Sequence, residues 1–386
     1  MSSRDPSMST YVGEYIWFDD NHQFRSKTRT FTTQFMGFET GNISWPEWNY
    51  DGSSTAQAEG NYSEVILKPV RVVKDPFRNN DDFGFKGFNT HCFLVLCDTY
   101  YPDGTPTNCN KRIEAKEIFD KGLEYQPWFG IEQEYFMMNT EGGRPLGFPL
   151  GPVDPEPQGK YYCGVGKDTV FGRELAEKHY KYCLVAGLKI SGINAEVAPG
   201  QWEFQIGPCE GIESGDHLWL ARYILVRLSE EYNITIDFHP KPVEGDWNGS
   251  GCHTNYSTCL MRDGEKASDK TGLVFINEAI ELLSKKHAEH MAVYGDDNNL
   301  RMTGLHETSD YRQFTNGVAN RGCSVRIPTM VLREECGYFE DRRPSSNCDP
   351  YLVTSKIFET TVVDEIDKIQ KENEKESDDE EVVVVA

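Results

Sequence analysis

The chain has 386 residues, and 39 lysines and arginines stand against 62 aspartates and glutamates, which gives a formal net charge of −23. This length accommodates two or three domains with a large buried core. The negative charge repels phosphate backbones and anionic lipid surfaces, so we expect neither a nucleic-acid partner nor a membrane partner. No apolar stretch of the sequence reaches the length of a membrane span.

The number and spacing of the cysteines indicate the cellular compartment in which the protein resides. Eleven of them are spread from Cys92 to Cys348 without the paired spacing of a metal finger, and the N-terminal residues carry no basic-then-apolar leader. This pattern is typical of a reduced intracellular protein. We therefore expect a cytoplasmic protein.

The N-terminal third reads as short strands with alternating apolar residues, at residues 15–18, 63–67 and 92–97. Turn-forming clusters such as DGSST separate these strands. This part of the sequence predicts a small, mostly β domain over residues 1–105.

From residue 111 onward the apolar residues recur with a helical period, at residues 111–125, 172–187, 215–232 and 272–295. Glutamate-rich strands lie between these helices. The pattern predicts a larger α+β domain over residues 106–370, in which an antiparallel sheet is flanked by helices.

The run ENEKESDDEE near the C-terminus has seven acidic residues among ten and no apolar anchor. Such a composition cannot form a packed core, because it offers too little apolar surface to bury. We therefore predict a disordered acidic tail over residues 371–386.

Two glutamates, Glu132 and Glu134, are spaced i and i+2 in a predicted strand, so both carboxylates project from the same face. A hairpin with its turn at residues 198–200 continues this pattern: Glu203 projects with Gln201 and Gln205 on one face of its second strand, opposite Trp202 and Phe204. Asn194 and Glu196 fall together in the first strand.

Two interpretations fit these acidic strands. One is a sheet with a solvated side, which the abundance of exposed glutamates makes common. The other is a metal site. The aromatic residues beside the glutamates, such as Trp202 and Phe204, favour a position near the core, where uncompensated carboxylates are costly and divalent cations compensate them.

His253 follows a glycine-rich segment in which Gly249 and Gly251 allow the backbone to approach a ligand closely. This segment is consistent with a substrate cradle that ends in a metal-binding histidine. It is equally consistent with a glycine-rich turn beside a structural histidine, which is the more frequent case.

Three short motifs in the C-terminal third, at residues 300–309, 320–328 and 337–344, combine arginines with glycines and strand residues. Arginine in such a setting is suited to bind carboxylate or phosphate groups. The alternative is that each arginine pairs with an acidic residue on the surface, which is common for one motif and less expected for three.

A series of longer motifs gives these residues a common context: WPEWNYDGSS, PWFGIEQEY, YYCGVGKD, NAEVAPGQWEFQIGPCEG, WNGSGCHTN, TGLHETS, GVANRGCSVRIP and GYFEDRRPSSNCDP. In this order they resemble the motif series of eukaryotic-type glutamine synthetases. The resemblance extends from about residue 14 to residue 355. It implies a small N-terminal β-grasp-like domain, a larger catalytic domain, and the ATP-dependent ligation of ammonia to glutamate.

The resemblance also implies two bound divalent cations, Mg²⁺ or Mn²⁺. The ligands of the cation near the glutamate would be Glu134, Glu196 and Glu203. The ligands of the cation at the nucleotide phosphates would be Glu132, His253 and Glu340.

The other site residues implied by the resemblance fall into three groups. The glutamate substrate would be bound by residues that include two of the metal ligands: Glu134, Asn248, Gly249, Gly251, His253, Arg301, Arg321 and Arg342. The ATP would be bound by Trp128, Glu132, Pro208, Asn255, Ser257, Arg326 and Tyr338. The ammonium ion would be bound by Asp51, Ser54, Tyr162 and Glu196.

The chemistry implied by the resemblance has two steps. The γ-carboxylate of glutamate first takes the terminal phosphoryl group of ATP, and metals and arginines must neutralise the charge that develops in this transfer. Ammonia then displaces phosphate. Arg326 and Arg342 would face the phosphates, and Arg301 and Arg321 would grip glutamate and the transferred phosphoryl group. The catalytic residues would be Arg321 and Arg326, together with Asp51, which acts as the base, and Glu307, which lies in a flap that excludes water.

The family resemblance further implies assembly into stacked homo-oligomeric rings, a decamer, in which the DGSS loop of one subunit completes the active site of its neighbour. Two alternative functions fit the same motifs. One is a related ligase that joins a different amine to glutamate. The other is a non-catalytic structural homologue, which should lack metal ligands, whereas every family ligand finds a counterpart here.

Overall fold

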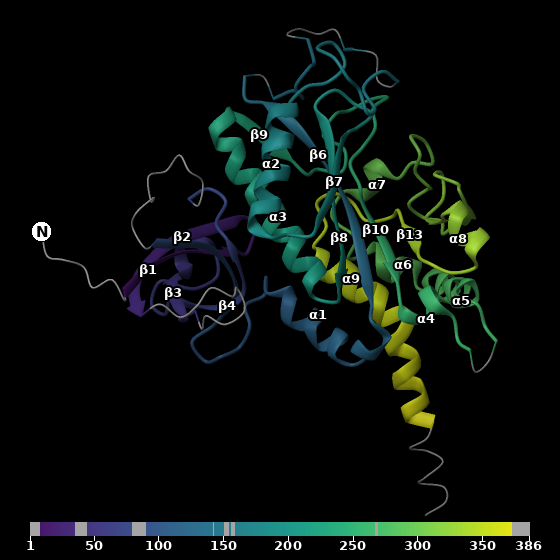
Figure 1. Ribbon diagram of the computed structural model, residues 1–386, viewed down its shortest axis with the longest axis horizontal. Helices are drawn as coiled ribbons and strands as arrows, with labels where there is room; N and C mark the ends of the chain where they lie inside the picture. The colour runs from purple at the N-terminus through teal and green to yellow at the C-terminus, as the bar shows by residue number, and fades with distance from the viewer. Residues whose placement is uncertain are drawn as a thin grey trace, which may run out of the picture. The chain divides into compact units, whose positions relative to one another are not determined.

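The structure is a computed structural model that describes residues 8–34, 45–78, 90–141, 143–149, 154–155, 159–266 and 269–372 (Figure 1). The chain contains both helices and strands, and most strand pairings of its two sheets are antiparallel, which confirms the predicted α+β class. Within these residues no helix is long and apolar enough to cross a membrane. The chain divides into two compact units, of which the first comprises Met1–Ile113, Glu174–Ile190 and Asp216–Tyr232 and the second the remaining residues.

The first unit is built on a five-stranded sheet with the strand order β2-β1-β5-β4-β3. Its strands are β1 (Met8–Phe18), β2 (Phe24–Gln34), β3 (Trp48–Asp51), β4 (Glu64–Lys74) and β5 (Thr90–Tyr100). The neighbouring strands β1 and β5 are parallel, and the other neighbours pair antiparallel. Alternate residues of β1 enter an aromatic core, in which Tyr15 and Trp17 pack with Trp45 and Phe93. The description of this unit as β-grasp-like stays a prediction.

Two helices from later in the chain belong for the most part to the first unit: α2 (Arg173–Ala186) and α3 (Glu213–Tyr232). They run side by side (Figure 1), and the imidazole of His179 lies 3.0 Å from the carbonyl oxygen of Ala221. Tyr223 of α3 donates a hydrogen bond to Glu14 of β1. The sequence assigned both helices to residues 106–370, and the compact unit around the small sheet includes them.

The second unit contains the larger sheet, in which the strand order is β11-β12-β13-β10-β6-β8-β7 and β9 also pairs with β6. All its pairings with a stated direction are antiparallel except that of β11 with β12. Its strands are β6 (Trp128–Asn139), β7 (Ile190–Ala195), β8 (Gln201–Glu210), β9 (Ile234–Asp237), β10 (Cys252–Ser257), β11 (Asn316–Val318), β12 (Val325–Ile327) and β13 (Phe339–Asp341).

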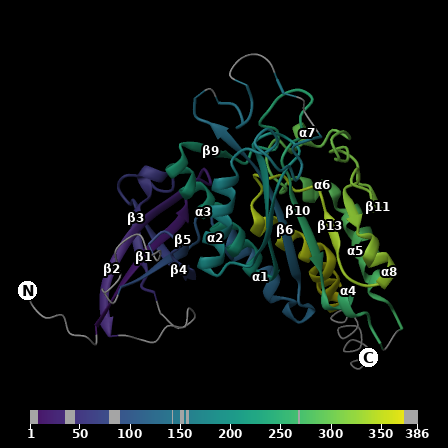
Figure 2. The same cartoon turned by 45° about the horizontal axis from the view of Figure 1, so that its top comes forward.

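Helices accompany this sheet in the second unit (Figures 1 and 2). They are α1 (Lys111–Asp120), η3 (Leu123–Tyr125), α4 (Cys259–Asp263), α5 (Gly272–Lys285), α6 (His287–Met291), α7 (Asn298–Arg301), α8 (Thr329–Glu334), α9 (Pro350–Phe358) and η4 (Glu359–Val363). The antiparallel sheet flanked by helices is the architecture predicted for the catalytic domain.

The C-terminal helix continues beyond η4 through residues 364–372, so the first two residues of the predicted acidic tail, Lys371 and Glu372, are helical. Residues 373–386 lie outside the described residues. The domain limits at residues 105 and 370 stay predictions.

Candidate active site

The register of the large sheet brings the predicted metal ligands to one face. Glu132 and Glu134 project from the same side of β6, as their i, i+2 spacing requires. In the register of β6 with β8, Glu134 lies opposite Glu203. In the register of β6 with β10, Glu132 lies opposite His253. Antiparallel pairing therefore places side chains that are about 70 to 120 positions apart in the sequence next to one another.

The first group of side chains, which we call the carboxylate cluster, consists of Glu134, Glu196 and Glu203. One oxygen of each lies within 4.8 Å of the others. All three are at most 9% exposed. Burial, followed for Glu196 and Glu203 by repulsion from neighbouring carboxylates, raises the pKa of Glu134 to about 7, that of Glu196 to about 8 and that of Glu203 to about 9.

Hydrogen bonds orient the carboxylate cluster. The backbone N–H of Gly251 donates to Glu134 Oε2 at 2.7 Å. The amide of Asn194 donates to Glu196 Oε1, also at 2.7 Å, and that of Gln205 donates to Glu203. A side chain at position 251 would collide with the imidazole of His253, since a Cβ there would lie 2.8 Å from Nε2. Gly251 therefore allows the backbone to come close enough to hold Glu134.

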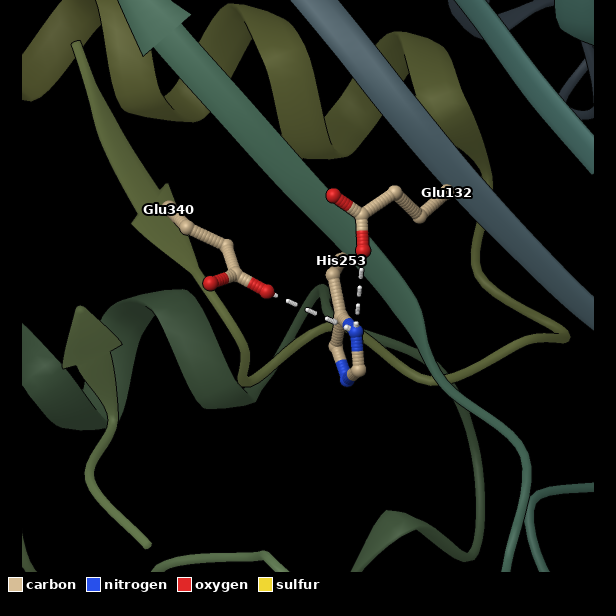
Figure 3. Close-up of side chains that lie close together, drawn as sticks. All are labelled: Glu132, His253 and Glu340. Atoms are coloured by element: carbon tan, nitrogen blue, oxygen red, sulfur yellow. Dashed lines mark ion pairs between the residues drawn. The ribbon is translucent and has the colours of Figure 1, made fainter. Parts of the chain in front are cut away.

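The second group, which we call the histidine cluster, consists of Glu132, His253 and Glu340 (Figure 3). The two carboxylates come from β6 and β13 and point toward the imidazole on β10 between them, with His253 Nδ1 at 3.6 Å from Glu132 Oε2 and 3.7 Å from Glu340 Oε1. Burial, reinforced by nearby arginines such as Arg342, lowers the pKa of His253 well below its usual value. The imidazole is therefore neutral at physiological pH, the form that binds metals.

Arginines surround the histidine cluster. Arg326, opposite Glu340 in the register of β12 with β13, donates from Nε to Glu340 Oε2. Arg342 donates from Nη1 to Glu340 Oε1 at 2.7 Å. Arg301 is buried, and its Nη2 donates to backbone carbonyl oxygens, including that of Arg343 at 2.8 Å. Burial lowers the pKa of Arg301 to about 10, and it stays protonated at neutral pH.

Both clusters line one cavity of about 310 Å³ in the second unit. Most of the site residues predicted from the sequence line it as well: Glu132, Glu134, Tyr162, Glu196, Glu203, Asn248, Gly249, His253, Arg301, Glu307, Arg321, Arg326, Glu340 and Arg342. A cavity that collects carboxylates, an imidazole and arginines can hold cations next to phosphate or carboxylate groups of a ligand.

Three of the predicted nucleotide residues lie on β6 and β10 beyond the histidine cluster. Trp128 is the register partner of Ser257. Asn255 donates from Nδ2 to Glu132 Oε1 at 2.8 Å, which links this end of the sheet to the histidine cluster. Two further nucleotide residues, Pro208 and Tyr338, are exposed.

Asp51 and Ser54 belong to the first unit, where both are exposed. Asp51 caps the short helix η1 (Gly52–Thr55), because its carboxylate accepts hydrogen bonds from the N–H and the hydroxyl of Ser53. The hydrogen bonds from Ser53 lower the pKa of Asp51. The ammonium-binding role of these two residues stays a prediction.

The structure adds residues that the sequence did not single out. Gly159, Val197, His306 and Thr308 line the cavity. Arg262 lies over the ring of Trp128, with its Cζ 3.8 Å from the ring centroid. The contact of Arg262 with Trp128 joins α4 to β6, and no periodic pattern in the sequence indicates it. Asn194 also lines the cavity, and its spacing of two residues from Glu196 did place the two side chains on one face.

Comparison with known proteins decides the family. The family model described as "Glutamine synthetase, catalytic domain" matches residues 104–379, which is more than half of the chain. The chain belongs to the glutamine synthetase family. The resemblance found in the motifs is thereby confirmed.

Curated glutamine synthetases of fungi are similar to the chain over nearly its whole length. That of Suillus bovinus is 53% identical over 351 residues, which are 91% of this chain and 93% of the relative. That of Agaricus bisporus is 52% identical with the same coverage. That of Saccharomyces cerevisiae is 50% identical over 368 residues, 95% of this chain and 93% of the relative. Glutamine synthetases are glutamate–ammonia ligases that require ATP and a divalent metal, and the two clusters are candidate metal sites.

Proposed function

We propose that the cavity of the second unit catalyses the ATP-dependent ligation of ammonia to the side-chain carboxylate of L-glutamate, giving L-glutamine, ADP and phosphate. The observation that carries this proposal is the meeting of two three-residue ligand clusters in one arginine-lined cavity. Membership of the glutamine synthetase family supports the same reaction.

The donors of both clusters fit hard divalent cations. Carboxylate oxygens and a neutral imidazole within 4.8 Å of one another are the ligands that Mg²⁺ and Mn²⁺ accept. A bound cation also removes the cost of burying three carboxylates side by side, which their raised pKa values indicate. We propose Mg²⁺ or Mn²⁺ at both sites, where the cations would neutralise charge on the reacting anions.

The arginines serve the first step. An oxygen of the γ-carboxylate attacks the terminal phosphorus of ATP, the bond from that phosphorus to the bridging oxygen breaks, and ADP leaves. We assign Arg321 and Arg326 to the transferred phosphoryl group, and Arg301 and Arg342 to glutamate and its neighbouring charges. Their guanidinium groups keep their charge at neutral pH, so the developing negative charge meets fixed positive charge.

In the second step ammonia attacks the carbonyl carbon of the γ-glutamyl phosphate, the bond from that carbon to the phosphate oxygen breaks, and phosphate leaves. We assign Asp51, Ser54, Tyr162 and Glu196 to binding ammonium, with Asp51 as the base that takes its proton. Glu307, which lines the cavity, would help to exclude water while the acyl phosphate exists.

We further propose the remaining contacts of the ligands. Glutamate would also lie against Glu134, Asn248, Gly249, Gly251 and His253, and the nucleotide against Trp128, Glu132, Pro208, Asn255, Ser257 and Tyr338. Arg262 would extend the nucleotide surface, because it already lies over Trp128.

The assembly is a further part of the proposal. We propose homo-oligomeric rings that form a decamer, in which the DGSS loop of one subunit completes the cavity of the next. Mixing Asp51→Ala subunits with Glu134→Ala subunits tests the sharing. Shared sites predict that two inactive proteins recover part of the activity after co-assembly, and a mixture that stays inactive contradicts it.

We propose a cytoplasmic location and a role in nitrogen metabolism. All eleven cysteines lie within the described residues and none forms a disulfide, which supports a reducing compartment.

The experiment that tests the function measures glutamine and phosphate formed from glutamate, ammonia and ATP, with and without Mg²⁺. We expect equal amounts of both products, and none without the metal. Replacing ammonia by polyamines separates the two related activities: faster phosphate release with a polyamine would favour a ligase for another amine. No product with any amine would favour the non-catalytic homologue.

A further inference from the structure

The loop at residues 303–309, which we call the flap loop, carries Glu307. Its backbone is left-handed at three of four consecutive positions, with φ of 80° at Gly304, 52° at His306 and 59° at Glu307. Residues other than glycine rarely adopt this conformation. Contacts with the rest of the unit are therefore needed to hold the loop in this shape.

Two of these contacts come from residues of the cavity. Arg342 donates from Nη2 to the carbonyl oxygen of Glu307 at 3.1 Å. Thr308 donates from its hydroxyl to the carbonyl oxygen of Arg301 at 3.3 Å. Both contacts hold residues 307 and 308 next to the arginines, and Arg321 Nη1 also lies 3.4 Å from Glu307 Oε2.

A further contact joins the flap loop to a segment that lies much earlier in the chain. His306 Nε2 lies 2.9 Å from Asp246 Oδ1. The two residues are 60 positions apart, and Asp246 stands two residues before Asn248, which lines the cavity. This pair joins the flap loop, of which His306 and Glu307 line the cavity, to the segment that leads to Asn248.

The segment that carries Asp246 is well anchored. Trp247 is only 3% exposed, and its ring packs against that of Phe148 at 4.8 Å between centroids. Lys241 donates to the carbonyl oxygen of Trp247. The backbone N–H of Ser250 donates to the carbonyl oxygen of Pro240 at 2.9 Å. The backbone next to Asp246 is therefore held in place by the rest of the unit, so that Asp246 can hold the flap loop.

We propose that Asp246 and His306 form a latch that holds the flap loop, and with it Glu307, over the cavity. Both are positioning residues: they act through Glu307 and are not assigned a contact with the reacting atoms. This inference rests on the proposed function, because it assumes an acyl phosphate that must be shielded. When the latch is broken, water attacks the acyl phosphate and returns glutamate and phosphate, so that ATP is hydrolysed without glutamine formation.

The experiment compares Asp246→Ala, His306→Asn and the double variant with the wild-type protein. Asparagine tolerates the left-handed backbone at position 306 but is too short to keep the contact. Glu244→Ala, which removes the same charge from an exposed position of the same segment, is the matched control. The measurement is phosphate release with glutamate and ATP but no ammonia, relative to release with saturating ammonia.

We expect this ratio to rise about 2- to 5-fold in each single variant, in line with the contribution of an exposed pair. The double variant should equal the single variants, because the second substitution removes a contact already lost. Asp246→Asn, which keeps an acceptor oxygen, should fall between the wild type and Asp246→Ala. Glu244→Ala should match the wild type.

Wild-type ratios in both single variants would overturn the latch while leaving the proposed function intact. A rise of the ratio in the double variant that equals the product of the rises in the two single variants would also overturn the latch, because it would show that the two residues act independently. A wild-type protein that forms no glutamine under any of these conditions would instead contradict the proposed function, and the latch with it.

Discussion

The two candidate metal sites lie on the same face of the large sheet but balance their charge differently. The carboxylate cluster joins three buried glutamates whose pKa values are raised, whereas the carboxylate of Glu340 in the histidine cluster binds both Arg326 and Arg342. Protein cations thus already compensate part of the histidine cluster. Arg301 and Arg342 act on Glu134, and Arg321 acts on Glu196, but these effects do not offset burial, so the carboxylate cluster must obtain most of its compensation from protons or from a bound cation.

This difference indicates a division of labour. A site that is short of positive charge should bind its own cation tightly and lose stability without it. A site lined with arginines is suited to a cation that arrives together with the phosphates of a nucleotide, because the arginines also bind phosphate oxygens. The following predictions test this contrast, beginning with the largest expected effect.

The largest effect should follow Glu134→Ala in the carboxylate cluster. Glutamine formation should fall by at least about 100-fold, since even residues that only support metal ligands cost 10- to 100-fold when replaced. Glu114→Ala, an exposed glutamate on α1, is the control and should keep full activity. Comparable activities of the two variants at saturating Mg²⁺ would break the contrast between the clusters.

The pH dependence of stability should differ with and without metal. Because the folded protein raises the pKa of Glu134, Glu196 and Glu203 from 4.5 to about 7, 8 and 9, it binds protons more tightly than the unfolded chain. Their stabilising contribution is present below pH 4.5 and is lost as the pH rises toward 9. Without metal, the free energy of unfolding should fall by at least about 3 kcal/mol over this range.

Mg²⁺ should reduce that loss at high pH, because the cation replaces the protons. Melting temperatures measured from pH 5 to pH 9 in EDTA and in Mg²⁺ provide the check. Curves that stay parallel over the whole range would show that the cation does not compensate these carboxylates.

Arg326→Gln should make the histidine cluster resemble the carboxylate cluster. Glu340 is fully buried and would lose one of its two guanidinium partners, so we expect a destabilisation of about 1 to 3 kcal/mol. The rise in melting temperature on adding Mg²⁺ should be larger than in the wild type. Arg333→Gln, at an exposed arginine of α8, should change neither quantity. An unchanged Mg²⁺ response of Arg326→Gln would argue against compensation by arginine.

The smallest effect is expected for Cys252→Ser. Cys252 is 1% exposed, and its thiol donates to Gln133 Oε1 at 3.5 Å on the face of the sheet opposite the ligands. A serine fits this place and can keep the hydrogen bond, so activity should stay within about twofold of the wild type. Complete loss of turnover in a folded variant would mean that the thiol takes part in catalysis.

Much of the site could be predicted from the sequence, because it lies on strands. Because side chains of a strand alternate between its two faces, Glu132 and Glu134 share one face, and Glu203 lies on the other face from its neighbour Trp202. The predicted hairpin is present as the neighbouring strands β7 and β8. The same alternation separates Arg342, which faces Glu340, from Arg343, which pairs with Asp341 on the other face. Arg343 thus pairs with an acidic residue, as the alternative interpretation proposed, but the pair is fully buried and does not lie on the surface.

Other features could not be predicted, because no local pattern encodes them. The contact of His306 with Asp246 joins two loops, and loops have no period from which a partner can be inferred. The helices α2 and α3 were correctly expected as helices, but periodicity cannot say which sheet a helix accompanies. The contacts among the strand residues thus depend on sheet register, whereas the contacts of loops and helices depend on tertiary packing.

The most direct test of the account counts bound cations. Titration of the metal-free protein with Mn²⁺ in the presence of ADP, followed by electron paramagnetic resonance, should find two sites per subunit in the wild type. The double variant Glu196→Ala/Glu203→Ala, which leaves the histidine cluster intact, should retain one. Fewer than two sites in the wild type, or two undiminished sites in the double variant, would contradict the assignment of these six side chains as two metal centres.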